Sequence, residues 1–526
     1  MDLTKANIEG FMIMGKIVGI DLGTTMSALS YLNDMGRPEV VANADGERIM
    51  PSAVYFADSQ RVLTGGEAIR SRHDDVTRAC RWIKRQMGDE SYTLRIDGKT
   101  YSPAEISSFI IKKLIQDAEL QIGKISDVLI TVPANFEDTA RNATINAGKI
   151  AGVNVLGLIN EPTAAAYYYA VVHDIQGKVL IFDLGGGTLD VTIANVTNDD
   201  VKIINSQGDR NLGGFNFDQL LVDYFADYYS QETNGGKLFE TNEERSIIED
   251  YAEETKISLS KRQSVSFRLQ GNNGTVKGEL SRVKYAEIIG RELSRIQLLV
   301  ECVLDEANET PVSIDHILLV GGSTRLPAVR DLLVDIFGKA PEMVGNVDEV
   351  VSLGAALYAG RRMAEEKPEE MSPGVAAVMR RSQTLVDVCN HSYGTLAVGY
   401  NDDKKCEEMM NTIIIKKNTP IPCSVTEDFY VRYDGQEAVD ASITQGEETD
   451  PDLVSVVSNQ TFRLPPNTPQ GSVIRVTYSY DKDQRMDCTF LHVDSGKKVC
   501  LQVDTKNIDD SSNRSSRRKL DGMNLE

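Results

Sequence analysis

The 526-residue sequence has few of the residues from which disulfide frameworks and metal clusters are built. Its seven cysteines are an odd number and form no Cys-x-x-Cys pair, and its five histidines are dispersed along the chain. Disulfide frameworks and zinc sites need paired or closely spaced ligands. The pattern therefore argues against a zinc site and favours reduced thiols, which indicates a cytoplasmic protein.

Long apolar segments are also missing. No apolar run approaches the roughly 20 residues that a membrane-spanning helix requires, so we expect no membrane partner. The apolar patch at residues 11–14 lacks a basic start and a cleavage site, which excludes the pattern of a signal peptide. We expect residues 1–14 to form a short N-terminal extension.

Basic residues are in deficit, and the formal net charge is −22. A negative surface of this size repels phosphate backbones, so we expect no nucleic-acid partner. The hydrophobic content of 41% is typical of a globular protein that can bury large cores.

Two stretches of the chain have the same pattern. Residues 16–32 read KIVGIDLGTTMSALSYL, and residues 178–196 read KVLIFDLGGGTLDVTIANV. In each, an apolar run ends in Asp-Leu-Gly, a Gly/Thr turn follows, and a second apolar alternation leaves the turn. This predicts a strand, a tight turn and a strand, in which glycine lets backbone N–H groups approach an anion closely.

The acid at the end of each first strand suggests what that anion is. Asp21 and Asp183 would face the same anion, which requires a cation between them, and Mg²⁺ with the phosphates of a nucleotide satisfies this. Two such hairpins, 162 positions apart, predict a duplicated protein with two lobes and one nucleotide between them.

The rest of the chain suggests further divisions. Strands and helices alternate as far as about residue 360, with helices expected at 103–120 and 138–151, so we expect sheets covered by helices. Short alternating strands after residue 385 predict a β-sandwich, and the polar end shows no helical pattern. The predicted segments are an extension (1–14), a nucleotide-binding domain (15–363), a linker (364–387), a sandwich (388–505) and a disordered tail (506–526).

Two weaker patterns accompany the hairpins. Residues 319–325 read LVGGSTR, a strand ending in a Gly-Gly turn that can approach a base or a phosphate. Glu253, Lys256 and Ser260 would share one polar face of a helix, which could hold a ribose and a base edge or could simply be solvated.

Seven segments in this order resemble the signature stretches of the 70-kDa heat-shock (DnaK-type) chaperones: IDLGTT, WIKRQMG, LITVPANFEDTARNAT, INEPTAAAYYYA, FDLGGGTLDVTI, NLGGFNFD and LLVGGSTRLPAV. The resemblance implies an actin-like, ribonuclease H-like duplicated α/β ATPase domain with two lobes, followed by an all-β sandwich. It also implies ATP or ADP as ligand, Mg²⁺ with K⁺ as a further candidate ion, and hydrolysis of ATP.

The resemblance implies a role for each matching residue. The catalytic residues would be Lys84, Glu161, Asp183, Thr188 and Asp190, and Asp21 and Asp183 would hold magnesium through water. The nucleotide contacts would be Gly23, Thr24, Thr25, Gly185, Gly186, Gly187, Glu253, Lys256, Ser260, Gly321, Gly322, Ser323, Arg325 and Asp348. Pro133 and Arg141 resemble the pair that passes the nucleotide state to the neighbouring domain.

The sandwich resembles the domain with which the family binds extended apolar peptides, and Thr395, Phe429, Val439 and Ala441 would line its pocket. Thr395 and Ala441 stand where the family has larger aliphatic residues. The linker is only partly apolar, and the family's helical lid has no counterpart after the sandwich. We therefore expect fast peptide exchange.

The sequence predicts an ATP-dependent chaperone of the stress-response type, with a J-domain co-chaperone and a nucleotide exchange factor as the implied partners. A second hypothesis is a nucleotide-gated binding module that serves one dedicated partner with slow or absent turnover. A third, a small-molecule kinase of the same superfamily, leaves the sandwich unexplained.

Overall fold

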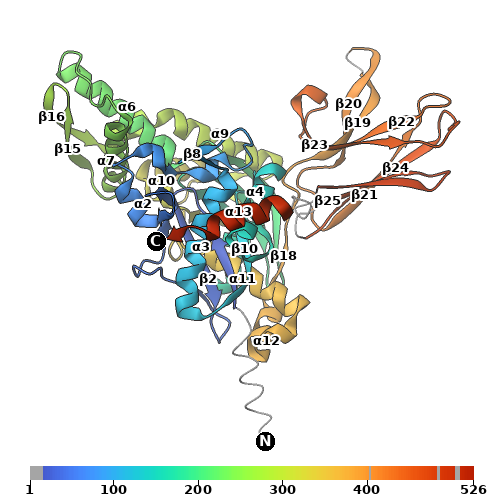
Figure 1. Cartoon of the computed structure of the whole chain (residues 1–526), viewed down its shortest axis with the longest axis horizontal. Coiled ribbons are helices and arrows are strands. Elements are labelled where there is room, and N and C mark those ends of the chain that lie inside the picture. Colours follow the sequence, from blue (N-terminus) through green and yellow to red (C-terminus); the bar gives the residue numbers. More distant parts are fainter. Residues whose placement is uncertain (1–15, 402–403, 483–485, 504–509) are drawn as a thin grey trace, which may run out of the picture. The chain divides into compact units, whose positions relative to one another are not determined.

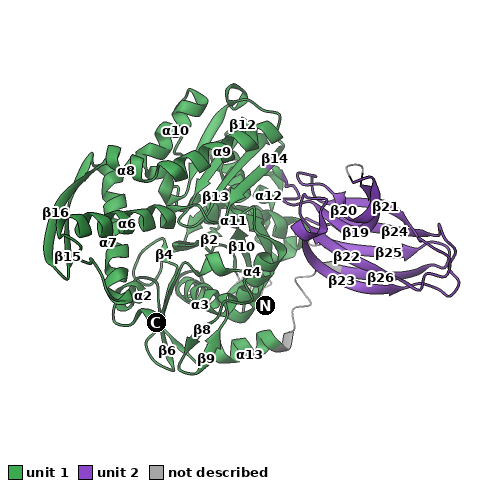
Figure 2. Cartoon of the chain, turned by 90° about the horizontal axis from the view of Figure 1, so that it is seen from above, with its two compact units in different colours: residues 1–201, 206–384, 511–526 green, residues 202–205, 385–510 purple. Residues whose placement is uncertain are grey.

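The computed structural model describes residues 16–401, 404–482, 486–503 and 510–526 (Figure 1). The chain divides into two compact units (Figure 2). The first comprises residues 1–201, 206–384 and 511–526, and the second comprises residues 202–205 and 385–510. The main boundary lies inside the predicted linker, and the predicted extension, 1–14, lies outside the described residues.

Two central sheets of the first unit follow one plan. The first has the order β11-β10-β1-β2-β3, with β4 beside β2, and the second contains β17-β12-β13-β14 in that order. The strands are β1 (Lys16–Asp21), β2 (Met26–Leu32), β3 (Pro38–Val40), β4 (Met50–Pro51), β10 (Ile125–Val132), β11 (Asn154–Asn160), β12 (Gly177–Leu184), β13 (Leu189–Val196), β14 (Asp200–Asp209) and β17 (His316–Val320).

The predicted duplication is visible in the strand pairing. Strand β1 is antiparallel to β2 and parallel to β10, and β12 is likewise antiparallel to β13 and parallel to β17. Asp21 and Asp183 occupy corresponding places, opposite Ala28 and Asp190 respectively. The predicted two-lobed, duplicated α/β fold is confirmed.

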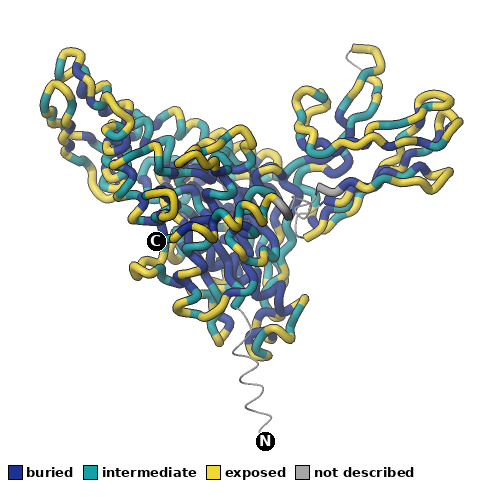
Figure 3. The backbone as a smooth tube through the Cα atoms, in the orientation of Figure 1, coloured by how far each residue is buried: buried dark blue, intermediate teal, exposed yellow. Residues whose placement is uncertain are grey.

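Helices cover these sheets, and Figure 3 shows how strongly the central strands are buried. The helices are α3 (Pro103–Ile122), α4 (Asp138–Ala151), α5 (Glu161–His173), α6 (Gly214–Glu232), α7 (Asn242–Lys261), α9 (Gly290–Glu306), α10 (Pro327–Phe337) and α11 (Val350–Glu366). A Cβ atom on Gly19 would lie 2.3 Å from the backbone nitrogen of Ala356. Only glycine on β1 therefore lets α11 pack this closely.

The first unit also contains smaller elements. One small sheet has the order β27-β6-β5-β7, and the hairpins β8–β9 and β15–β16 stand apart. The bounds are β5 (Ala53–Phe56), β6 (Arg61–Thr64), β7 (Ala79–Arg81), β8 (Leu94–Ile96), β9 (Lys99–Tyr101), β15 (Ser264–Gly271), β16 (Gly274–Ser281), β27 (Asn524–Leu525), α2 (Gly65–Ser71), α8 (Arg282–Ile288), η1 (Val76–Arg78), η2 (Ile83–Gln86), η3 (Pro311–Ser313) and η4 (Gly322–Arg325).

The second unit is the predicted β-sandwich. Its sheets have the orders β20-β19-β22-β23 and β21-β24-β25-β26, and Ile443, Tyr478 and Phe490 belong to the core between them. The elements are β19 (Tyr393–Asn401), β20 (Cys406–Ile415), β21 (Cys423–Tyr430), β22 (Ala438–Gln445), β23 (Ser455–Arg463), β24 (Val473–Tyr480), β25 (Met486–His492), β26 (Lys497–Val503) and η6 (Pro451–Leu453).

Two segments differ from expectation. The first part of the predicted linker is helical, because α11 runs to Glu366 and is followed by η5 (Pro368–Glu370) and α12 (Pro373–Arg381) before β18 (Thr384–Val386). Val375, Ala376 and Met379 of α12 are buried, so this segment packs on the first unit instead of forming an open tether.

The prediction that the polar end lacks helical structure is also corrected. Residues 510–521 form α13 (Asp510–Asp521), and β27 follows it. Their apolar side chains were too few to give a helical pattern in the sequence, and contacts with the first unit order them instead. In the described part of the chain, we find no helix with the length and apolar character of a membrane span.

Candidate functional site

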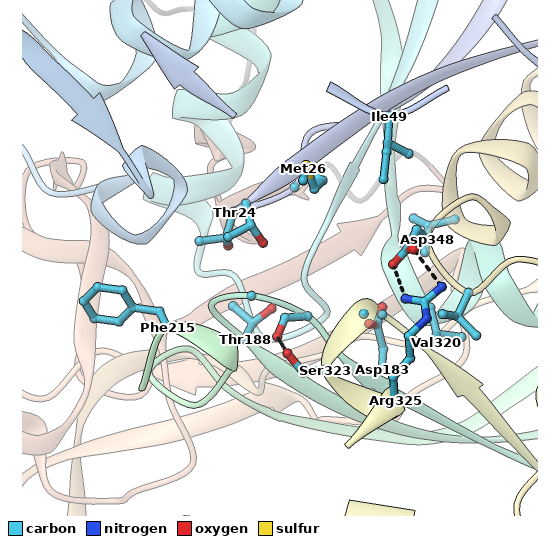
Figure 4. Close-up of a pocket in the computed structure, with 18 of the residues that line it drawn as sticks. Thr24, Met26, Ile49, Asp183, Thr188, Phe215, Val320, Ser323, Arg325 and Asp348 are labelled. Carbon is cyan, nitrogen blue, oxygen red and sulfur yellow. Dashed lines mark hydrogen bonds and ion pairs between the residues drawn. The ribbon is translucent and has the colours of Figure 1, made fainter. Parts of the chain in front are cut away.

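The tips of both hairpins open into one cavity of about 390 Å³ within the first unit (Figure 4). Most of the predicted nucleotide-site residues line it: Asp21, Gly23, Thr24, Thr25, Lys84, Glu161, Asp183, Gly185, Gly186, Thr188, Glu253, Lys256, Ser260, Gly321, Gly322, Ser323, Arg325 and Asp348. Gly187 and Asp190 do not line the cavity. Segments that are far apart in the sequence therefore converge where the hairpin pattern placed a nucleotide.

Glycine at the second tip allows the two loops to meet. A Cβ atom on Gly186 would lie 1.9 Å from Thr25 Oγ1, and one on Gly187 would lie 2.5 Å from Thr24 Cγ2. Any side chain at either position would collide with the threonines of the first loop. Gly187 thus contributes to the closeness of the loops, and Thr24 and Thr188 lie on the two sides of the cavity (Figure 4).

A buried lysine and several buried carboxyl groups form the floor of the cavity. Lys84 is 4% exposed and donates a hydrogen bond from Nζ to Glu161 Oε1. Burial lowers the pKa of Lys84, but the attraction of Glu161 and Asp21 outweighs it, so the net shift is upward. The lysine is therefore a fixed positive charge, which is what a γ-phosphate and its attacking water require.

The carboxyl groups at and beside the cavity floor are crowded, and this disfavours their charged forms. Burial and the neighbouring Glu161 raise the pKa of Asp21 to about 7 and that of Asp190 to about 8, and the pKa of Asp183 also rises for these reasons. Asp190 Oδ1 accepts the backbone N–H of Ala134 at 3.2 Å, while its buried Oδ2 has no hydrogen-bond partner. Such a cluster favours the arrival of a cation.

The donor set suits magnesium held through water. Within the described residues, no three His, Cys, Asp or Glu side chains converge as direct metal ligands. Mg²⁺ commonly keeps several waters and uses one or two carboxylates plus substrate phosphates. Asp21 and Asp183, at corresponding strand ends, fit that pattern.

The residues predicted to contact adenosine are fixed by partners that the sequence did not reveal. Lys256 Nζ lies 2.6 Å from Asp218 Oδ2, and burial raises the pKa of Asp218 to about 7 although Lys256 opposes this. Arg325 pairs with Asp348 at 2.8 Å (Figure 4), and Ser323 donates to the carbonyl oxygen of Gly185 at 2.9 Å. Lys256 thus lines the cavity and does not lie on a solvated face.

The cavity also has an apolar lining that our sequence analysis missed. It includes Met26, Ile49, Phe215, Val320 and Val351. Met26, Phe215 and Val320 lie within quoted segments, but the sequence analysis used only the polar and glycine residues of those segments, and Ile49 and Val351 lie outside them. Apolar walls with a few fixed polar groups are typical of nucleotide and cofactor pockets.

A cluster of charges, which we call the clasp, connects the small β5–β7 sheet to helix α7. It consists of Arg72, His73, Arg81, Glu249, Asp250 and Glu253. Asp250 is its centre, with Arg72 at 3.0 Å, Arg81 at 2.8 Å and His73 at 2.9 Å. Glu253 therefore faces Arg81, at 2.9 Å, as well as the cavity.

Pro133 and Arg141 flank a pinned loop. Arg141 is buried and donates to the carbonyl oxygens of Phe136 at 2.9 Å and Ala134 at 3.2 Å. It also reaches Asn160 Oδ1 at 2.7 Å, next to Glu161. The guanidinium thus ties the loop that follows Pro133 to the start of α5.

The predicted peptide-site residues lie in the sandwich. Thr395 and Ala441 are buried, and Phe429 and Val439 are partly buried against the core. The hydroxyl oxygens of Thr395 and Ser442 are 3.3 Å apart, and Tyr478 Oη lies 2.7 Å from the carbonyl oxygen of Gly394 and 3.0 Å from that of Ser442. This end of the sandwich interior is therefore polar.

The fold and the cavity define a two-lobed, actin-like nucleotide-binding unit followed by a β-sandwich. Comparison with known proteins agrees: a family model described as "Hsp70 protein" matches residues 17–524. A DnaK chaperone protein of Thermosipho melanesiensis is 35% identical over 500 residues, which are 93% of this chain and 80% of that relative. One from Thermotoga neapolitana is 36% identical over 501 residues, with the same coverage.

The chain belongs to the Hsp70 family. The resemblance drawn from the seven sequence segments is confirmed.

Proposed function

We propose that this protein is an ATP-dependent molecular chaperone that binds Mg·ATP in the cavity and hydrolyses it to ADP and phosphate. The observation that carries the proposal is the convergence of two acid-tipped, glycine-lined hairpins on a buried lysine in one cavity. The family and its DnaK relatives support the same activity.

The chain's own groups divide the work of phosphoryl transfer to water. Backbone N–H groups of the two glycine loops face the phosphates, and Lys84 supplies positive charge where negative charge spreads in the transition state. Glu161, whose Oε1 holds Lys84, would orient the attacking water. Magnesium, when held by Asp21 and Asp183 through water, would neutralise phosphate oxygens.

The nucleotide state would then control how the β-sandwich binds extended apolar peptide segments. Such peptides are recognised through backbone hydrogen bonds and a side-chain pocket. We further propose that this exchange is fast, that a J-domain co-chaperone and an exchange factor act on the cycle, and that the protein works in the cytoplasm.

One observation favours a second function. Thr395 and Ser442 make the sandwich interior polar next to the predicted pocket residues Thr395 and Ala441. A nucleotide-gated module for one dedicated partner would tolerate such a pocket. Binding of a panel of unfolded peptides to the full chain, followed by fluorescence anisotropy, separates the two functions, because no binding to any peptide favours the dedicated partner.

The magnesium role is tested by Asp183→Asn. The variant should lose most of the difference between ATP affinity measured with magnesium and with a chelator, because a carboxylate outside the water shell is removed. Calorimetry checks this, and an unchanged difference would contradict the role.

In wild type, phosphate release from ATP without any added acceptor would argue against a kinase.

Mg·ATP should also stabilise the purified chain. Ligand at about 100 times its Kd adds about 2.7 kcal/mol to the free energy of unfolding. A thermal scan with and without Mg·ATP measures the shift, and an unchanged midpoint would refute nucleotide binding in the cavity.

A further inference from the structure

Residues 510–526, which we call the strap, extend the small sheet of the first unit. Strand β27 lies parallel to β6, and the C-terminal end of the chain is seen next to β6 in Figure 2. Asn524 N donates to Gln60 O at 2.6 Å, and Glu526 N donates to Val62 O at 2.9 Å. In return, Thr64 N donates to Glu526 O at 2.9 Å.

Side chains fix the strap to the same lobe. Leu520 and Met523 are 3% and 8% exposed and belong to the core around the first sheet. The Lys519 ammonium lies 3.8 Å from the centre of the Tyr101 ring and 3.1 Å from Glu105 Oε1. Apolar burial, a cation–π contact and an ion pair thus act together.

The strap is helical only through these contacts. Helix α13 reads DSSNRSSRRKLD and has one apolar side chain, Leu520. A helix of this length without an apolar stripe is marginal in water. Docking of the strap and folding of its helix are therefore one event. When the strap detaches, no independently stable helix has to unfold.

The sheet that the strap extends leads to the catalytic lysine. Its order is β27-β6-β5-β7, and β7 ends at Arg81, three residues before Lys84. Displacement of β6 would pass through β5 to β7, which leads into η2, where Lys84 lies.

We infer that the docked strap positions Lys84 for ATP hydrolysis, through the β6–β5–β7 sheet, and that its release lowers turnover while leaving the nucleotide contacts intact. The catalytic part of this inference rests on the proposed ATPase function. The strap, a segment of this chain, occupies the edge of β6 and acts as a positioning element.

The test uses the full chain with Leu520→Asp and Met523→Asp combined, and Ser515→Asp as the control. Ser515 is exposed on the same helix, so the control adds a charge without disturbing the buried contacts. Hydrogen exchange of the Thr64 amide reports docking, because its acceptor is Glu526 O. Steady-state ATPase kinetics report positioning.

In the double variant, Thr64 exchange should accelerate about tenfold or more, as for a locally opened segment. The kcat should fall roughly tenfold with little change in KM, because misplacement of a catalytic group acts on the chemical step. The control should match wild type. A synthetic peptide of residues 510–526 should restore both readouts when it is added to the double variant.

Lys519→Ala is the second variant, because it removes the contact with Tyr101 without opening a cavity in the core. It should shift both readouts in the same direction by a smaller amount. Retained Thr64 protection in the double variant would refute Leu520 and Met523 as the anchors of the strap, and lost protection with unchanged kcat would refute positioning. If wild type hydrolysed no ATP, the proposed function would fail together with the positioning role, whereas Thr64 exchange would still decide on docking.

Discussion

Lys84 shows how a single residue acquires a role from its surroundings. In the sequence it stands between arginines at 81 and 85 and has the appearance of a surface lysine. In the structure the three side chains diverge: Arg81 faces the clasp, Arg85 reaches the carbonyl oxygen of Gly187, and Lys84 is buried against Glu161. Trp82 makes this possible by adopting a left-handed backbone conformation, φ 58°, just before η2.

Lys84→Ala should retain nucleotide binding but hydrolyse ATP roughly 10²-fold or more slowly, the usual scale for one preorganised charge. Single-turnover hydrolysis and ATP affinity measured in parallel check this. The variant also leaves Glu161 unpaired, so a thermal scan must show that it is folded at the assay temperature. Normal turnover would show that the catalytic assignment is wrong.

Asp218 should make stability depend on pH. Its pKa is about 7 in the folded state against an ordinary value of 3.8, so between these values the folded protein holds more protons than the unfolded chain. The free energy of unfolding should therefore fall as pH rises from about 4 to about 7. Asp218→Asn removes this contribution, and its Tm relative to wild type should rise from pH 5 to pH 7.5.

Nucleotide-free protein is required for this comparison. Lys256, the partner of Asp218, lines the cavity, so a bound nucleotide would change the surroundings of Asp218. Asp223→Asn, at an exposed position of the same helix α6, is the matched control. A Tm difference between Asp218→Asn and wild type that stays constant over this pH range would contradict the prediction.

At the scale of elements, the clasp joins two parts of the first unit that close over the cavity. Its cations come from the segment around β7 and its carboxylates from α7, the helix that also carries Lys256 and Ser260. Residues that line the cavity and the carboxylates of the clasp thus lie on one helix. Opening of the cavity would require the ion pairs to break.

Asp250→Ala removes the ion pairs with Arg72 and Arg81 and the contact with His73, and should therefore accelerate ADP release about tenfold, which corresponds to about 1.4 kcal/mol of lost closure energy. Stopped-flow displacement of a fluorescent ADP analogue measures the rate. Glu254→Ala, at an exposed position of the same helix, should behave as wild type. Equal release rates in Asp250→Ala and wild type would exclude the clasp as a barrier.

At the scale of the whole molecule, the order of segments along the chain matters. The second unit lies between segments of the first, since the chain leaves the first unit after Thr384 and returns to it at Ser511. Within the first unit, Tyr167 Oη lies 2.9 Å from Ser382 Oγ, and Thr384 N donates to Asp199 O. The exit point of the chain is thereby anchored.

If nucleotide state and peptide binding are coupled, a mixture of unfolded peptides should raise the steady-state ATPase rate of the full chain. The physical reason is linkage, because a peptide that prefers one nucleotide state shifts the population of the cycle toward it. Phosphate release with and without peptides measures the effect. A rate that does not respond to any peptide would favour the dedicated-partner function.

The sequence alone determined the parts that depend on local pattern. Asp-Leu-Gly with its Gly/Thr turn specifies a hairpin whatever surrounds it, and the expected helices at 103–120 and 138–151 correspond to α3 and α4. Alternation after residue 385 likewise predicted the sandwich. These signals are strong because periodicity, turns and caps act over a few residues.

Only the tertiary structure decided which distant groups meet. Asp218 beneath Lys256, Asp250 within the clasp, and the strap on β6 are contacts between residues separated by tens to hundreds of positions. No local rule encodes them, because each depends on how whole elements pack. The strap is the clearest case: its polar sequence indicates disorder, and it becomes ordered because another part of the chain offers an unpaired strand edge and a place for two apolar side chains.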